Sequence, residues 1–187
     1  MRFHFTDGRS LEFQKYYVQI TGNRQRFLGG TPFFRTFKTR YALQGIDARC
    51  LARLEASKHE LLNCITSDQL VPMYQRYFAD TEIRHGNQVV RKNLGSFFAK
   101  FVHTFNPEQY CALDNPIREL LGLKRESFFQ SFLAISEAYR KWIAQHPDSM
   151  SQVRSAVPAS ARCYSEQMTD LKLLDLIFWH SANGAKN

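Results

Sequence analysis

Residues 125–146, RESFFQSFLAISEAYRKWIAQH, contain the strongest helix signal in the chain. Their apolar side chains recur at spacings of three and four, which is the period of one face of an α-helix. That face consists of Phe128, Phe132, Ile135, Tyr139 and Trp142. Pro147 follows, and we expect it to end the helix because proline has no N–H group to donate. The segment predicts a long helix with one face in the core.

Further helices are predicted on both sides of this one. They start at Thr31-Pro32, run over about 47–66 behind Asp47, restart after Ser67 or Asp68, and cover about 93–105, 117–121 and 165–181. Asp114-Asn115-Pro116 opens the helix 117–121, since Asp accepts hydrogen bonds from free N–H groups and Pro gives up none there. We therefore expect an all-α protein, a compact orthogonal bundle of about six to eight helices.

Three segments are predicted to be less regular. Residues 1–30 have no clear helical period, and the alternation of Phe3, Phe5, Leu11 and Phe13 around Asp7-Gly8 favours a short N-terminal strand pair. Residues 148–162 are predicted as a loop with a short helix at most, and His85-Gly86-Asn87 as a turn. No internal repeat or linker is evident, so residues 1–187 are expected to form a single helical domain.

The composition is that of a globular protein, with 44% hydrophobic and 14% aromatic residues. The opening MRFHFTDGRS lacks the apolar run of a signal peptide, and no run of about 18 apolar residues predicts a membrane span. We expect a soluble cytoplasmic protein without a membrane partner. The 4 cysteines form no CxxC pair, and the 6 histidines show no metal-ligand spacing. Neither a metal nor a cofactor is expected.

The net charge of +8 would attract phosphate polymers or anionic membranes. Basic residues cluster in two regions of the chain. In the first fifty positions they lie near aromatic residues, and the second region, residues 83–107, contains no acidic residue. The candidate nucleic-acid contacts are Arg24, Arg26, Arg35, Lys38, Arg40, Arg91 and Lys92. Their aromatic neighbours, which could stack on bases, are Tyr16, Tyr17, Phe33, Phe34 and Phe37. The alternative is an aromatic stripe facing the core, with a solvated basic back.

A lysine inside an aromatic helix and an aspartate at the next helix start suggest chemistry. Lys100 stands between Phe98-Ala99 and Phe101-Val102, where desolvation would favour the neutral, nucleophilic amine. Asp114 is expected to stay ionised at its helix N-terminus. Such a pair could cleave an N-glycosidic bond. The alternatives are a lysine that reaches solvent and an aspartate that only caps its helix.

Two other side-chain types bear on the function of this segment. His103, one turn beyond Lys100, could act as a proton shuttle. Trp142 and Trp179 stand at apolar helical spacing, which predicts core positions rather than a wedge between bases.

The common phosphate-loop, dinucleotide, zinc-helix and nucleophile-elbow signatures do not occur in the chain. The run SFFAKFVHTFNPEQYCALDNPIREL (96–120) instead resembles bacterial 8-oxoguanine-glycosylase-like proteins of the helix-hairpin-helix DNA glycosylase superfamily. The closing LKLLDLIFWHSA (171–182) is also similar to the end of such proteins. The resemblance implies a helical fold, DNA contact and base flipping. It also implies Lys100 at the lysine position, Asp114 at the aspartate position and Gly95 in the hairpin.

From these observations we expect a DNA-binding protein with a glycosylase-like scaffold. We expect it to excise a damaged or modified base, as in DNA repair. DNA is expected as partner rather than RNA. Two alternatives stay open. One is a non-catalytic nucleic-acid-binding module of a phage-defence or mobile-element system. The other is a protein–protein interaction domain whose basic residues serve solubility.

Overall fold

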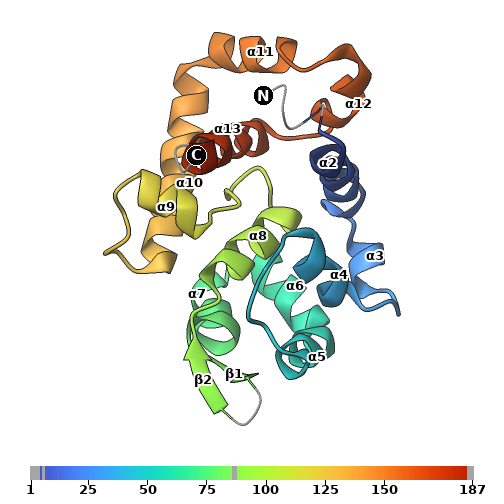
Figure 1. Ribbon diagram of the computed structural model, residues 1–187, viewed down its shortest axis with the longest axis vertical. Coiled ribbons are helices and arrows are strands. Elements are labelled where there is room, and N and C mark those ends of the chain that lie inside the picture. The colour runs from blue at the N-terminus through green and yellow to red at the C-terminus, as the bar shows by residue number, and fades with distance from the viewer. Residues whose placement is uncertain (1–4, 6, 86–87, 185–187) are drawn as a thin grey trace.

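A computed structural model describes residue 5 and residues 7–85 and 88–184. This part of the chain contains twelve α-helices and one two-stranded antiparallel sheet, which confirms the all-α fold class (Figure 1). The helices outnumber the six to eight expected, because several predicted segments break into shorter helices. No helix in the described ranges is long and apolar enough to cross a membrane.

The N-terminal segment is helical rather than irregular. Asp7 accepts a hydrogen bond from the Ser10 N–H at 2.9 Å and caps α2 (Gly8–Ile20). Tyr16, Tyr17 and Ile20 are buried along this helix, at the three- and four-residue spacing of a helix face. The predicted strand pair at this end is therefore wrong as far as residues 8–20 are concerned. Phe3 lies outside the described residues.

The rest of the first half consists of short helices. They are α3 (Arg24–Leu28), α4 (Phe33–Arg40), α5 (Ala48–Ala56), α6 (Lys58–Thr66), α7 (Leu70–Tyr74) and the π-helical turn η1 (Gln75–Ala79). Asp47 caps α5 by accepting the Cys50 N–H at 2.8 Å, as predicted. The single helix expected over 47–66 is broken at Ser57, whose N–H ends α5 on the carbonyl of Arg53.

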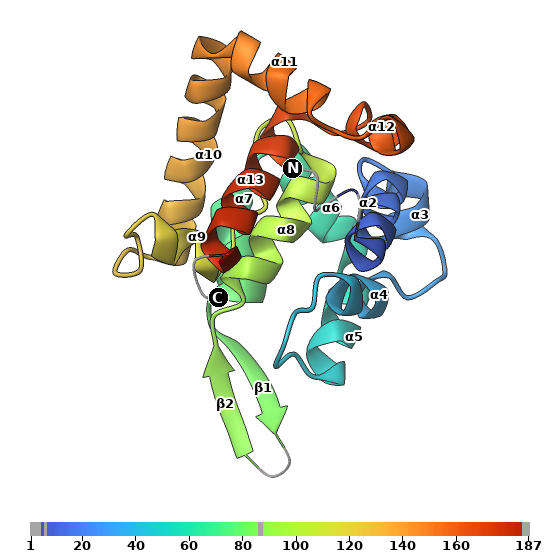
Figure 2. The same cartoon turned by 45° about the horizontal axis from the view of Figure 1, so that its top comes forward.

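The strand pair that does form lies in the middle of the chain. Strands β1 (Thr81–His85) and β2 (Gln88–Lys92) pair antiparallel, with Ile83 opposite Val90. Ile83 is buried and attaches the hairpin to the core, while the hairpin projects from the helical body (Figure 2). The predicted turn at residues 85–87 falls mostly on Gly86 and Asn87, which lie outside the described residues.

The second half carries the longer helices. They are α8 (Gly95–Phe105), α9 (Asn115–Leu120), α10 (Phe128–Gln145), α11 (Pro147–Ser155), the 3-10 turn η2 (Ala159–Ala161), α12 (Arg162–Ser165) and α13 (Asp170–Gly184). Ser127 caps α10 by accepting the Gln130 N–H. The apolar face predicted for this helix is buried from Phe128 to Tyr139. Pro147 follows the end of α10 but starts α11, where its missing N–H costs nothing. Within the segment 148–162, the possible short helix is confirmed at 148–155, and the loop interpretation is wrong for those residues.

The buried apolar side chains form two clusters. The larger one is rich in phenylalanine and surrounds α8, whose Phe97, Phe98 and Phe101 are almost completely buried. The smaller one joins α2, α11 and α13. Helix α13 supplies Leu171 and Leu174 to the first cluster and Leu173 and Leu176 to the second. This explains why α13 is apolar nearly all round, and it confirms the prediction that it is deeply packed.

Candidate active site

The start of α8 holds Lys100 in place. Asn93 Oδ1 accepts the Gly95 N–H at 2.9 Å, and the Leu94 N–H donates to the Phe78 carbonyl at 2.7 Å. Gly95 lies so close to Phe128 that a Cβ there would stand 2.2 Å from the ring. Helix α8 is therefore packed tightly at its first turn, and Lys100 follows one and a half turns later.

Asp114 ends a buried connection and caps α9. Its Oδ1 accepts the Ile117 N–H at 3.2 Å, and Pro116 stands in the first turn. The preceding Cys111, Ala112 and Leu113 are buried, and the Cys111 N–H donates to Ser136 Oγ at 3.0 Å. The predicted cap is confirmed, and the packed connection gives the carboxylate a defined position.

The two predicted catalytic side chains meet. Lys100 Nζ lies 3.5 Å from Asp114 Oδ2, and the side chains are 13% and 8% exposed. Burial lowers the pKa of Lys100, and the negative charge of Asp114 opposes that shift. Burial also raises the pKa of Asp114, against the effect of Lys100. The Ile117 N–H at the helix terminus lowers the pKa of Asp114, as expected, but by less than burial raises it.

The pair opens into a pocket of about 650 Å³, which falls in the size range of small-molecule sites. Its wall is formed by residues of the α4–α5 connection, the start of α8, the start of α9 and the start of α10. Lys92 and Lys124 contribute further positive charge to the wall, and Glu126 one negative charge. The resulting hollow is lined with cations around a single buried carboxylate.

Arg118, which also lines the pocket, has a structural role. Its guanidinium donates to the carbonyl of Leu123 at 3.1 Å and to Ser131 Oγ at 3.3 Å, and it lies 4.9 Å from the ring centre of Phe128. These contacts tie the 121–127 loop to α9 and α10. Gly122 in that loop has a φ of +72°, a left-handed conformation that suits the predicted end of α9.

The predicted nucleic-acid contacts are divided between α3, α4 and the strand β2. Arg24, Arg26 and Arg35 are exposed on α3 and α4. Arg40, also exposed, packs over the Tyr16 ring at 5.6 Å. Lys38 is half-buried and donates to the Ile46 carbonyl at 2.6 Å, so its ammonium is already used within the fold.

The two basic residues of β2 differ from each other. Arg91 forms ion pairs with Asp80 at 2.6 Å and with Glu82 at 3.6 Å, which partly neutralises it. Lys92 lines the pocket, and its ammonium packs against Gly45, where the backbone has a φ of +66°. Of this predicted set, Lys92 is the residue that reaches the pocket of Lys100 and Asp114.

Several aromatic predictions are corrected by burial. All five side chains that were considered for base stacking are buried, so they form the core-facing stripe of the alternative interpretation. They are Tyr16, Tyr17, Phe33, Phe34 and Phe37. Trp142 and Trp179, which were expected in the core, are 37% and 38% exposed, and each lies in the C-terminal half of its helix.

His103 is a structural residue rather than a proton shuttle. It is completely buried, its Nδ1 lies 2.6 Å from the Tyr110 carbonyl, and its Nε2 lies 2.8 Å from Tyr17 Oη. A carbonyl only accepts, so Nδ1 carries the proton and Nε2 accepts from the tyrosine. Burial lowers the pKa of His103 to about 3, which keeps the ring neutral.

Sequence reasoning missed a second buried ion pair. Lys172 Nζ lies 3.1 Å from Asp175 Oδ2 on α13, and both side chains are under 7% exposed. The pair lines a second pocket of about 520 Å³ that also includes Lys100, Tyr41 and Trp179. The available signal was two charges of opposite sign, three residues apart, in the otherwise apolar run 171–179.

The described side chains do not bring three or more His, Cys, Asp or Glu together in a group that could hold a metal ion. No protein-family model matches this chain, and no significant match to a curated protein or to a solved structure is found.

Proposed function

We propose that the protein excises a base from DNA, with Lys100 as the nucleophile and Asp114 as the carboxylate that stabilises positive charge on the sugar. The observation that carries the proposal is the 3.5 Å pair of a buried amine and a buried carboxylate, open to a 650 Å³ pocket. Burial lowers the pKa of Lys100 and raises the pKa of Asp114, and such shifted pKa values are typical of functional sites.

The chemistry follows from the two groups. As the bond between C1′ and the base nitrogen breaks, the base leaves with the bonding electrons and takes up a proton. The sugar becomes positively charged, and an ionised Asp114 stabilises that charge. The neutral amine of Lys100 then attacks C1′ and loses a proton. Opening of the sugar ring converts the adduct into an imine, which borohydride reduces to a stable amine.

Attachment to DNA is assigned to the exposed arginines. Arg24, Arg26 and Arg35 have exposed side chains on neighbouring helices, and the whole chain carries +8. Phosphate contacts by such residues give affinity without sequence preference. Because the aromatic neighbours are buried, binding is proposed to depend on charge rather than on stacking with them.

The test is a cleavage and trapping assay. Duplexes with 8-oxoguanine, modified cytosine or an abasic site are incubated with the protein, with and without borohydride. We expect a strand break or a covalent adduct for at least one duplex, and loss of the adduct by at least a hundredfold in Lys100→Met. Lys124→Met is the matched control, because Lys124 lines the same pocket but is 76% exposed and paired with Glu119.

Binding of the same duplexes is measured separately as a function of salt. Salt-dependent binding without cleavage or trapping across the panel would exclude the enzyme and leave the non-catalytic nucleic-acid-binding module. A flat titration against DNA and RNA at low salt would leave the protein–protein interaction domain.

A further inference from the structure

The buried pair Lys172–Asp175 is an unusual feature of α13. Its side chains are 4% and 6% exposed, so both charges have lost nearly all their water. The Lys172 ammonium lies 5.0 Å from the Tyr17 ring centre and 5.7 Å from that of Phe13. Asp175 Oδ1 is buried without a hydrogen-bond partner in the part of the chain that is described. An ion pair that is buried and incompletely bonded contributes little to stability, which points to another role.

This pair shares a pocket wall with Lys100. The 520 Å³ pocket is lined by Lys100 from α8, Lys172 and Asp175 from α13, and Tyr41 from the end of α4. Lys100 also lines the 650 Å³ pocket on the side of Asp114. Lys100 therefore belongs to two pocket walls, one shared with Asp114 and one shared with the Lys172–Asp175 pair.

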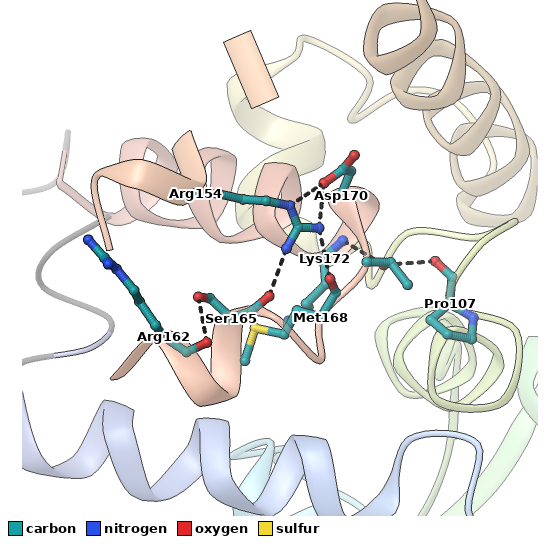
Figure 3. Close-up of polar contacts among 8 residues, drawn as sticks. Pro107, Arg154, Arg162, Ser165, Met168, Asp170 and Lys172 are labelled. Atoms are coloured by element: carbon teal, nitrogen blue, oxygen red, sulfur yellow. Dashed lines mark hydrogen bonds and ion pairs between the residues drawn. The ribbon is translucent and has the colours of Figure 1, made fainter. Parts of the chain in front are cut away.

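The start of α13 is fastened to the segment that joins Lys100 to Asp114 (Figure 3). Thr169 Oγ1 donates to the Pro107 carbonyl at 3.1 Å and accepts the Lys172 N–H at 3.1 Å. Arg154 donates to Asp170 Oδ1 at 3.0 Å and to the Met168 carbonyl at 3.0 Å. The Thr169 bond holds the start of α13 against the α8–α9 connection, and the Arg154 bonds hold it against α11, so the charges of α13 keep a defined position relative to Lys100.

We propose that Lys172 and Asp175 are positioning residues that control the protonation of Lys100 through their opposite charges. The Asp175 carboxylate favours the ammonium form of Lys100, and the Lys172 ammonium favours the neutral amine. Because the side chains of Lys100, Lys172 and Asp175 are themselves largely buried, at 13%, 4% and 6% exposed, these charges are less screened than charges on the surface. The catalytic consequence rests on the proposed nucleophilic role of Lys100, whereas the electrostatic effect does not.

Other charged and titratable groups also face Lys100. Asp114 lies closest, and the ring centre of Tyr41 lies 5.9 Å from Lys100 Nζ. Arg9 and Arg40 stand at the exposed edge of the second pocket, and the first pocket adds further charged residues. These are Lys92, Arg118, Lys124 and Glu126. Burial lowers the pKa of Lys100, the carboxylates of Asp114 and Asp175 raise it, and Lys172 lowers it further.

The test is a titration of Lys100 in the whole protein without DNA. Lysine labelled with ¹³C at Cε gives one NMR signal per residue, and Lys100→Met assigns the signal of Lys100. We expect the midpoint to fall by about one pH unit in Asp175→Asn and to rise by about one unit in Lys172→Met. The double variant is expected to return close to wild type, and Lys172→Arg, which keeps the charge, is expected to change the midpoint little.

The two single variants must shift the midpoint in opposite directions for the proposal to hold. Shifts in the same direction, or shifts under about 0.3 unit in folded variants, would overturn it. Lys172→Gln and Asp175→Ser are the second variants if the first ones do not fold. Because this titration needs no DNA, it is independent of the trapping assay. If trapping works in the wild type, its pH profile is expected to move with the midpoint in each variant.

Discussion

Lys100 Nζ and Asp114 Oδ2 lie 3.5 Å apart across the gap between two consecutive helices, and both side chains are almost completely buried. Asp114 also accepts the Ile117 N–H. The same carboxylate therefore caps α9 and compensates the positive charge of the Lys100 ammonium. Burial alone would drive both groups towards their neutral forms, and each one opposes that tendency in the other. The effects of substituting Lys100 and of substituting Asp114 on the stability of the protein are therefore expected to depend on each other.

Asp114→Ala is expected to destabilise the protein more than the loss of a helix cap alone, which costs about 1 kcal/mol. The substitution also removes the carboxylate nearest to a buried ammonium, and breaking a buried pair costs about 3–5 kcal/mol. Urea denaturation would show a smaller loss when Lys100→Met is present as well. Strictly additive losses in the double variant would mean that the two charges do not interact.

Stability is expected to fall on acidification because of His103. Its pKa is about 3 in the fold and 6.5 in its ordinary environment, so below pH 6.5 the unfolded chain binds a proton that the folded ring refuses. The stability conferred by this neutral ring is thus present above pH 6.5 and is lost as the pH falls towards 3, at up to about 1.4 kcal/mol per pH unit.

Denaturation curves between pH 7 and pH 5 check this prediction. His103→Asn is expected to be less stable at pH 7 but to show a flatter dependence on pH than the wild type. His59→Gln serves as the control for removing a histidine, since the His59 side chain is exposed and the substitution leaves the buried contacts of His103 intact. An unchanged slope in His103→Asn would contradict the assignment.

Gly95→Ala is expected to destabilise the protein by about 1–3 kcal/mol, because the new methyl group would stand 2.2 Å from the Phe128 ring. Gly30→Ala is the matched control, as a Cβ there meets no atom within 4 Å. Thermal melting of both variants compares the two positions. Equal melting temperatures would show that Phe128 moves aside without cost.

The salt dependence of DNA binding compares exposed arginines for which no ion pair is found among the described residues with the ion-paired Arg91. Replacing Arg24 or Arg26 by Gln is expected to reduce the slope of log K against log salt by about 0.9 for each phosphate that is no longer neutralised. Arg91→Gln should reduce it less, because Arg91 is paired with Asp80 and Glu82. A larger effect of Arg91→Gln than of Arg24→Gln or Arg26→Gln would indicate that DNA binds to the β-hairpin instead of to α3.

Local signals in the sequence were sufficient for several of the helices. The caps at Asp47 and Asp114 were predicted and are confirmed, as is the buried face of α10 from Phe128 to Tyr139. Such features depend on residues within one or two turns, so they can be recognised without the rest of the chain. Where one pattern fits two structures, prediction was wrong. Leu11 and Phe13 alternate as in a strand but lie in α2, and Pro147 can end a helix or begin one.

The candidate site was predicted only in part, for a related reason. Lys100 and Asp114 were chosen from their local surroundings, whereas the partners at Lys172 and Asp175 lie 58 to 75 residues further along the chain. The burial of Tyr16, Tyr17, Phe33, Phe34 and Phe37, which excludes base stacking by them, likewise depends on the helices packed over them. Local periodicity shows that one face of a helix is buried, but it does not show which residues cover that face.

The sequence by itself determined the helical class, the basic charge and the capping residues, because these follow from composition and from interactions within a few residues. Only the tertiary structure decided that an amine and a carboxylate share a pocket, that His103 is enclosed and neutral, and that a second ion pair lies on the same wall as Lys100. These outcomes depend on distances between segments far apart in the chain, and such distances arise when the apolar faces of α8, α9 and α13 pack together and exclude water.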